Sequence, residues 1–131
     1  MESKVAPRRI LIADDHAPIR EEIRAMLASE PDLEVVGDAE DGKEALAMCQ
    51  RLRPHLVLMD VSMPRMGGFE ATRAIKERYS RTAVLIVTAH QGQDYLQEGI
   101  RAGAVGYITK GAPKEQLIDT VRRTLNDEPL L

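Results

Sequence analysis

Short apolar runs alternate with amphipathic stretches along the whole chain. The run from Leu56 to Met59 lacks the period-two alternation of a half-exposed strand and is too short for a buried helix, so it predicts a strand covered on both faces. Pro64 forbids further ladder pairing, and Asp60 stands where the run stops. Similar runs predict five strands, at residues 10–13, 33–36, 56–60, 83–87 and 105–109.

Apolar residues at helical spacing predict a helix after each of these strands. Pro31 and Pro54 end the first two helices, and Pro113 suits the first position of the last one. Three glycines weaken the prediction for the fourth helix. The five helical stretches cover about residues 17–29, 41–53, 71–79, 94–101 and 113–125.

This alternation of strands and helices predicts an α/β fold, a doubly wound five-stranded parallel sheet with helices on both faces. With the strand order 2-1-3-4-5, the topological switch point lies between the first and third strands. Asp14 and Asp15 follow the first of these strands, and Asp60 ends the third. Because open α/β sheets place their sites at the carboxyl ends of strands, we expect the acids to meet there.

The chain is long enough for one domain with a real core. We expect this domain to cover residues 8–126. A polar tail occupies residues 1–7, and residues 127–131 form a second tail or the start of a linker.

Charge and cysteine content bear on two questions, whether the chain binds nucleic acid and in which compartment it works. The net charge is −3 and no block of Lys or Arg is longer than a pair, which argues against direct nucleic-acid binding by this chain. The lone Cys49 suits a reducing compartment. Without an apolar signal-peptide core or a membrane-length apolar run, we expect a cytoplasmic protein that does not contact the membrane.

Four strand ends bring three acids, a hydroxyl and an ammonium to one rim of the predicted sheet. Two carboxylates about 4 Å apart repel by roughly 4 kcal/mol at an effective dielectric near 20, so the acids need a cation. Carboxylates without a His or Cys cluster favour Mg²⁺, which also accepts phosphate oxygens. A carboxylate can attack phosphorus while these groups hold the transferring oxygens. The residues are Asp14, Asp15, Asp60, Thr88 and Lys110.

Four short motifs of the chain occur in the same order as in the receiver domain of two-component response regulators. On these motifs, about residues 8–125 resemble that domain. The motifs are the acid pair, the stretch from Met59 to Pro64, Thr88-Ala89, and the stretch from Tyr107 to Lys110. Each motif is weak alone, but the set is highly specific. The family often has proline after the lysine with a cis bond, whereas Gly111 follows here, so we do not expect a cis bond.

The resemblance implies a role for each matching residue. Asp60 would accept phosphate from a histidine kinase, and Lys110 would pair with Asp60 and the phosphoryl group. Mg²⁺ would bind Asp15, Asp60 and the backbone carbonyl of Ser62, with Asp14 helping through water. Thr88 would hydrogen-bond the phosphoryl oxygen.

Tyr107 would turn inward as Thr88 moves, changing the face made by the fourth helix, fifth strand and fifth helix. A phosphorylation-linked homodimer through this face is a further expectation. Ser62 and His90 lie two residues past Asp60 and Thr88, where either would tune hydrolysis of the acyl phosphate. His16, His55 and His90 lack ligand spacing and are expected to be solvated or satisfied.

Further motifs, including Asp14-Asp15-His16 and Lys110-Gly111-Ala112-Pro113, resemble the subgroup with a helix-turn-helix effector of the NarL or LuxR type. No effector is present in this chain, so it is expected to be either a receiver cut from a transcription factor or a free-standing one. The chain would not be an enzyme, having only self-phosphorylation and autodephosphorylation chemistry.

Simpler interpretations remain open for the same residues. Asp14 and Asp15 could cap the first helix, and Tyr107 could be a residue at the edge of the core. An aspartate-nucleophile phosphatase would need a second Asp where Ser62 stands, and a flavin-binding module would need a phosphate loop where Asp14 and Asp15 repel phosphate. A degenerate receiver that acts only by docking is the third alternative.

Overall fold

Every strand of the structure is followed by a helix. The computed structural model describes residues 6–89, 92–128 and 130. The strands are β1 (Arg8–Ala13), β2 (Leu33–Ala39), β3 (Leu56–Met59), β4 (Ala83–Thr88) and β5 (Gly106–Thr109). The helices are α1 (Ala17–Ala28), α2 (Gly42–Leu52), α3 (Gly68–Arg78), α4 (Gln93–Ala102) and α5 (Lys114–Leu125).

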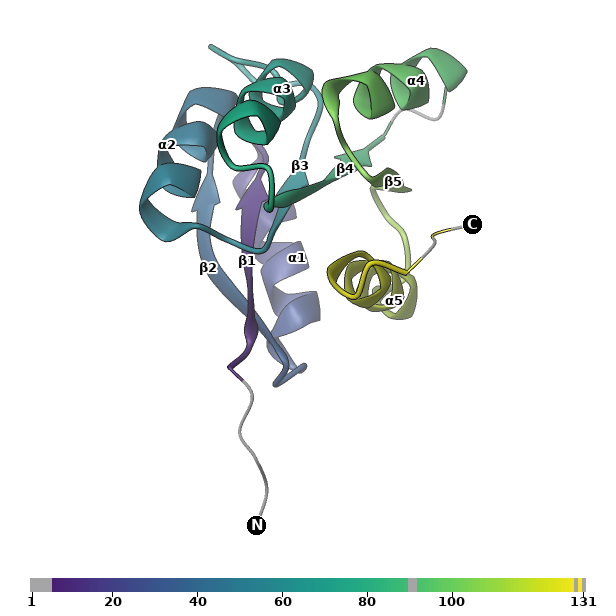
Figure 1. The fold of residues 1–131 in the computed structure, drawn as a ribbon. Coiled ribbons are helices and arrows are strands. Elements are labelled where there is room, and N and C mark those ends of the chain that lie inside the picture. The colour runs from purple at the N-terminus through teal and green to yellow at the C-terminus, as the bar shows by residue number, and fades with distance from the viewer. Residues whose placement is uncertain (1–5, 90–91, 129, 131) are drawn as a thin grey trace.

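The five strands form one parallel sheet in the predicted order β2-β1-β3-β4-β5. Figure 1 shows the central strands β1 and β3 side by side, with the chain entering β1 from below. In this register Ala13 pairs with Met59, so Asp14 and Asp60 leave the sheet at the same level on adjacent strands. The predicted switch point between these strands is therefore confirmed.

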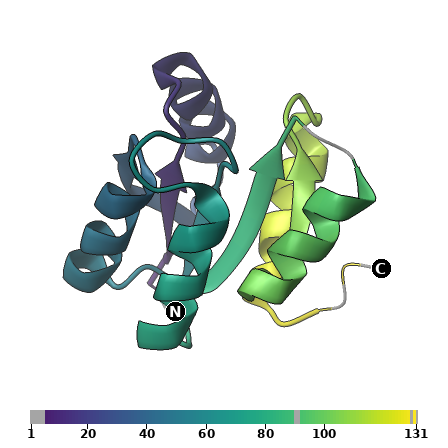
Figure 2. The same ribbon diagram turned by 90° about the horizontal axis from the view of Figure 1, so that it is seen from above.

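Helices cover both faces of the sheet. One apolar core joins the sheet to α1 and α5 through residues such as Ile23, Leu27 and Val121, and the other joins it to α2 and α3 through Cys49 and Ile75. Figure 2 shows α4 and α5 at the same edge of the sheet, beside the edge strand β5. Because both faces are buried, β3 reads as an unbroken apolar run, as the sequence predicts.

Element boundaries differ from the sequence prediction by one to three residues, most at the end of β2 and the start of α3. β2 continues to Ala39, with a register shift opposite Ile10 and Leu11 that the short apolar run does not reveal. α3 begins at Gly68, where the chain passes against the Asp60 carbonyl too closely for a side chain. Pro113 precedes α5 as its N-cap residue and does not occupy the first helical position.

Within the described residues, no helix has the length and apolar character that a membrane crossing requires.

Candidate functional site

The acidic site lies where β1 and β3 end. The Asp60 amide donates to the Ala13 carbonyl at 2.9 Å, and the Asp14 amide donates to the Ala39 carbonyl at 3.0 Å. These bonds continue the sheet pattern one residue past each strand and fix both acids at its carboxyl edge. Parallel pairing thus converts two sequence-distant acids into neighbours.

Four side chains converge here closely enough to share an ion. Ligand atoms of Asp14, Asp15, His16 and Asp60 all lie within 4.8 Å of one another. Asp14 and Asp60 are buried, with only 2% and 4% of their surfaces exposed, whereas Asp15 and His16 face solvent. The site is therefore a buried acid pair with a polar mouth.

Lys110 reaches this pair from the end of β5, which is separated from β3 by β4. Its ammonium lies 2.9 Å from Asp14 Oδ2 and 3.1 Å from Asp60 Oδ1. Its backbone amide donates to the Thr88 carbonyl at 2.8 Å, which fixes where its side chain starts. Burial acts to lower the pKa of Lys110, but hydrogen bonds to the two carboxylates outweigh it, so the pKa is raised and the ammonium stays charged.

The Asp60 carboxylate is incompletely satisfied. Its Oδ1 accepts from the Val61 amide at 2.9 Å and from Lys110, but its buried Oδ2 has no hydrogen-bond partner among the described residues. Burial raises the pKa of Asp60, and the Asp14 charge raises it further against the opposing effect of Lys110. A buried carboxylate oxygen without a partner is costly, which marks the position for a cation or an electrophile.

Comparison with known protein families agrees with this geometry. Residues 10–122 match the model of the response regulator receiver domain, which is most of the chain. The chain belongs to the response regulator receiver family. The expectation drawn from the motifs is confirmed.

Relatives of this receiver are transcriptional regulators. The transcriptional regulatory protein YxjL of Bacillus subtilis strain 168 is 38% identical over 122 residues, covering 93% of this chain and 56% of YxjL. DegU of Brevibacillus brevis is 39% identical over 114 residues, covering 87% of this chain and 48% of DegU. The chain thus spans about half the length of the curated relatives it matches.

Solved receiver structures have the same fold. A LuxR-family two-component response regulator from Aurantimonas sp. SI85-9A1 superimposes with a TM-score of 0.89 at 34% identity, covering 95% of this chain and 89% of that one. The response regulator domain of Thermotoga maritima CheB gives a TM-score of 0.85 at 32% identity, with 94% and 99% covered. Similarity to LuxR-family receivers agrees with the motifs of the NarL or LuxR subgroup.

The donor set of this receiver fits a hard divalent ion. Three of the four clustered side chains are carboxylates, and Asp60 Oδ2 is buried without a partner among the described residues. Oxygen ligands of this kind suit Mg²⁺, which keeps several waters. The structure therefore has an acidic group that could hold a metal, as the sequence predicts.

Other predicted site residues lie around this receiver pocket. Thr88 is buried at the end of β4, and Ser62 is exposed two residues beyond Asp60. Thr88 and Tyr107 line one groove beside α4, and 43% of Tyr107 is exposed. His90 lies outside the described residues.

Two contacts of the receiver site were not predicted from the sequence. His16, expected to be solvated, is largely exposed, but its Nδ1 lies 3.0 Å from Asp15 Oδ1 and 3.2 Å from Asp14 Oδ1. Arg20 donates to the Asp14 carbonyl at 2.7 Å. The sequence could have indicated the His16 contact, because His16 directly follows the acid pair. It gave no such indication for Arg20, which lies one helical turn further along α1. His55 is satisfied as expected, because its Nδ1 accepts from the Arg9 amide at 2.9 Å.

The capping alternative for the acid pair is wrong. His16 is the N-cap residue of α1 and makes no side-chain cap, while Asp14 Oδ1 accepts from the His16 amide at 2.9 Å just before the helix. Neither Asp14 nor Asp15 is therefore the N-cap residue of α1. The Lys110–Gly111 bond is trans, as expected, since the described residues contain no cis peptide bond.

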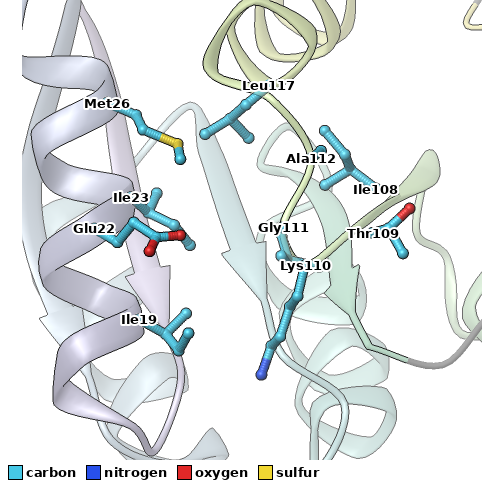
Figure 3. Close-up of a pocket in the computed structure, with 11 residues that line it drawn as sticks. Ile19, Glu22, Ile23, Met26, Ile108, Thr109, Lys110, Gly111, Ala112 and Leu117 are labelled. Atoms are coloured by element: carbon cyan, nitrogen blue, oxygen red, sulfur yellow. The ribbon is translucent and has the colours of Figure 1, made fainter.

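A small apolar groove opens beside the receiver's lysine. It lies between α1 and the segment from β5 to α5, and Figure 3 shows Met26 and Leu117 facing each other across it. Ile19 and Ile23 continue its α1 wall, and Lys110 lies along its other side. This groove is apolar surface next to the acidic pocket.

Proposed function

We propose that this receiver accepts a phosphoryl group on Asp60 from a histidine kinase and thereby switches the face formed by α4, β5 and α5. The proposal rests on Asp60 Oδ2, a buried carboxylate oxygen without a hydrogen-bond partner among the described residues. Such an oxygen is available to bond phosphorus. The resulting signal would control an effector, as in the relatives described as transcriptional regulators.

The transfer step uses side chains that lie at this edge of the sheet. A carboxylate oxygen of Asp60 forms a bond to phosphorus while the bond from phosphorus to the donor histidine nitrogen breaks, and that nitrogen leaves with its electron pair. Lys110, already 3.1 Å from Asp60, offsets negative charge on the transferred group. Thr88 supplies a hydroxyl to a phosphoryl oxygen.

Asp14, Asp15, Asp60 and the backbone carbonyl of Ser62 would hold Mg²⁺ in this scheme. The ion would supply charge neutralisation between the carboxylates and the incoming phosphoryl oxygens. The close approach of the carboxylates supports this assignment, because without a cation besides Lys110 their mutual repulsion is only partly compensated.

The groove shared by Thr88 and Tyr107 supports the proposed switch. Thr88 moves toward the phosphoryl group, and Tyr107, exposed in this structure, turns into the groove beside α4. The outer surface of α4, β5 and α5 changes as a result, and a homodimer through this face is the proposed readout.

The donor kinase needs a surface near Asp60. The apolar groove lined by Ile19, Ile23, Met26 and Leu117 supports such docking, since it borders Lys110 (Figure 3). Chemistry beyond the transfer is limited to self-phosphorylation by small phosphodonors and autodephosphorylation, with Ser62 and His90 tuning the latter. Turnover of external phosphate esters is not expected.

The proposal is tested by mass spectrometry after incubation with acetyl phosphate and Mg²⁺. Wild type should gain one phosphoryl group, and Asp60→Asn should gain none. Asp119→Asn is the matched control, because Asp119 is an exposed acid on α5. It should be labelled like wild type.

Two results would contradict the proposal. Equal labelling of wild type and Asp60→Asn would show that another residue accepts the phosphoryl group. No labelling of wild type, by acetyl phosphate or by a panel of histidine kinases, would favour the degenerate receiver that acts only by docking.

A further inference from the structure

The loop that leaves Asp60 is tied to the start of α2. This loop connects β3 to α3 and contains Ser62, and Arg65 lies at its far side. Arg65 Nε donates to Asp41 Oδ2 at 2.6 Å, and Asp41 Oδ1 accepts from the Glu44 amide at 2.8 Å as the N-cap of α2. One buried carboxylate therefore bonds to both the start of α2 and the loop.

A second tie does not depend on charge. The Gly42 amide donates to the Met66 carbonyl at 2.8 Å. A Cβ at Gly42 would lie 2.5 Å from that carbonyl oxygen, so only glycine allows the loop to approach this closely. We call Asp41, Gly42, Arg65 and Met66 the loop clamp.

The loop is also closed at its base beside Asp60. The Gly68 amide donates to the Val61 carbonyl at 2.8 Å, and Gly68 passes against the Asp60 carbonyl without room for a side chain. Ser62 thus lies in a short segment that is fixed at its base by Gly68 and at its far side by the loop clamp.

The backbone at Arg65 is adapted to this contact. Arg65 has φ of +66°, a left-handed conformation that is uncommon for a residue with a side chain. Asp41 is only 8% exposed, whereas 58% of the Arg65 side chain is exposed. The hydrogen bond from the Glu44 amide, followed by that from Arg65, lowers the pKa of Asp41, so the carboxylate stays ionised for the contact.

We propose that Asp41 and Arg65 are positioning residues for the ion site. They hold the loop so that Asp60 and the Ser62 carbonyl are in place before the ion binds, and less ordering accompanies binding. The inference rests on the proposed function in one respect, namely that Asp14, Asp15, Asp60 and Ser62 form the ion-binding set. Neither Asp41 nor Arg65 needs to touch the ion.

The test measures Mg²⁺ affinity directly, by calorimetric titration of the unphosphorylated protein. Arg65→Ala should weaken Mg²⁺ binding about 3- to 10-fold, less than the roughly 10- to 100-fold seen when direct partners of metal ligands are removed, because Arg65 bonds Asp41 and not an ion ligand. Labelling by acetyl phosphate should slow by the same factor at low Mg²⁺ and recover at saturating Mg²⁺. A general loss of structure would instead lower the rate at both concentrations.

Asp41→Asn and its combination with Arg65→Ala distinguish an effect of the Arg65 contact from an effect of losing the N-cap of α2. Asp41→Asn keeps an oxygen for the Glu44 amide but loses the charge that holds Arg65. It should weaken Mg²⁺ binding like Arg65→Ala, and the double variant should bind no more weakly than either single variant, because all three break one interaction. Arg73→Ala is the matched control, since it removes an exposed ion pair to Glu98 of 3.2 Å between α3 and α4.

The outcomes distinguish this inference from the proposed function. Wild-type Mg²⁺ affinity in Arg65→Ala, or additive losses in the double variant, would overturn the clamp while labelling of Asp60 still stands. Failure of wild type to be labelled, with Mg²⁺ binding that depends on Arg65, would overturn the phosphoacceptor assignment and leave the clamp in place.

Discussion

Charged side chains at the two ends of the sheet have different kinds of partner. At the amino end, Arg9 donates to the carbonyls of Leu52 and Arg53 where α2 ends, and Lys76 donates at 2.8 Å to both Ser80 and Thr82. Each of these cations meets carbonyl oxygens, which favour positive charge near helix ends. At the carboxyl end, Asp14 and Asp60 share one ammonium and repel each other.

This difference separates structural charge from functional charge. The basic residues at the amino end have partners supplied by the fold itself, so they stabilise it without a ligand. The carboxyl end leaves Asp60 Oδ2 without a partner among the described residues. An incomplete set of partners in a buried site is what a ligand can complete, and such sites usually lower stability.

Among these tests, removal of Lys110 should give the largest change in the free energy of unfolding. Lys110→Met leaves Asp14 and Asp60 buried without their cation, and breaking a buried pair in this way costs about 3 to 5 kcal/mol. The free energy of unfolding should be measured by urea denaturation without Mg²⁺ at pH 7. The loss should shrink in acid, where the unpaired carboxylates take up protons.

Lys114→Met is the matched control, because Lys114 is exposed at the start of α5. A Lys110→Met variant as stable as this control would show that the ammonium is not needed to hold the two acids together.

Addition of Mg²⁺, which we expect to bind at the carboxyl end, should give the second largest change in the free energy of unfolding. Ligand that binds only the folded state raises the free energy of unfolding by about 2.7 kcal/mol at 100 times its dissociation constant. Thermal denaturation with and without Mg²⁺, at matched ionic strength, measures this gain. Asp15→Asn should reduce it, and an equal gain in wild type and Asp15→Asn would place the ion elsewhere.

The sequence was sufficient for the part of the site that parallel strands determine. Asp14, Asp60, Thr88 and Lys110 each follow or end a strand, and parallel pairing brings strand ends to one edge whatever the loops do. The fold order and the convergence of the acids with the lysine were predictable for the same reason.

Loop conformation was the part that sequence patterns could not provide. The contact of Arg65 with Asp41 occurs with a left-handed backbone at Arg65 and a close backbone approach at Gly42, and no apolar periodicity encodes either one. The register shift opposite Ile10 and Leu11, which accompanies a longer β2, depends in the same way on pairing with a neighbouring strand.

A substitution at the amino end should affect stability alone. Arg9→Met keeps the aliphatic stem but removes the charged donor to the Leu52 and Arg53 carbonyls, at a cost of about 1 to 2 kcal/mol. Urea denaturation measures the cost, and calorimetry with acetyl phosphate labelling should give wild-type Mg²⁺ affinity and rate. A changed Mg²⁺ affinity would mean that the two ends are coupled.

Asp60→Asn should give the smallest change in the free energy of unfolding, and it should raise stability whereas the other substitutions lower it. Burial raises the pKa of Asp60 above its ordinary value of 3.8, so the folded protein binds more protons than the unfolded chain between those two values. Wild-type stability therefore falls as the pH rises through that window, and the neutral amide escapes this loss. Without Mg²⁺ at pH 7, the variant should gain of the order of 1 kcal/mol, or roughly 3 to 6 °C in Tm.

Calorimetry at pH 7 and again below pH 3.8 checks both the sign and its cause, because the gain should vanish in acid, where Asp60 is protonated in both states. Asp119→Asn, which removes only an exposed i,i+4 ion pair with Arg123, should change Tm little at either pH. An Asp60→Asn variant that melts below wild type at pH 7 would mean that Lys110 satisfies the carboxylate fully. The contrast between the two ends of the sheet would then fail at the residue on which the proposed phosphorylation depends.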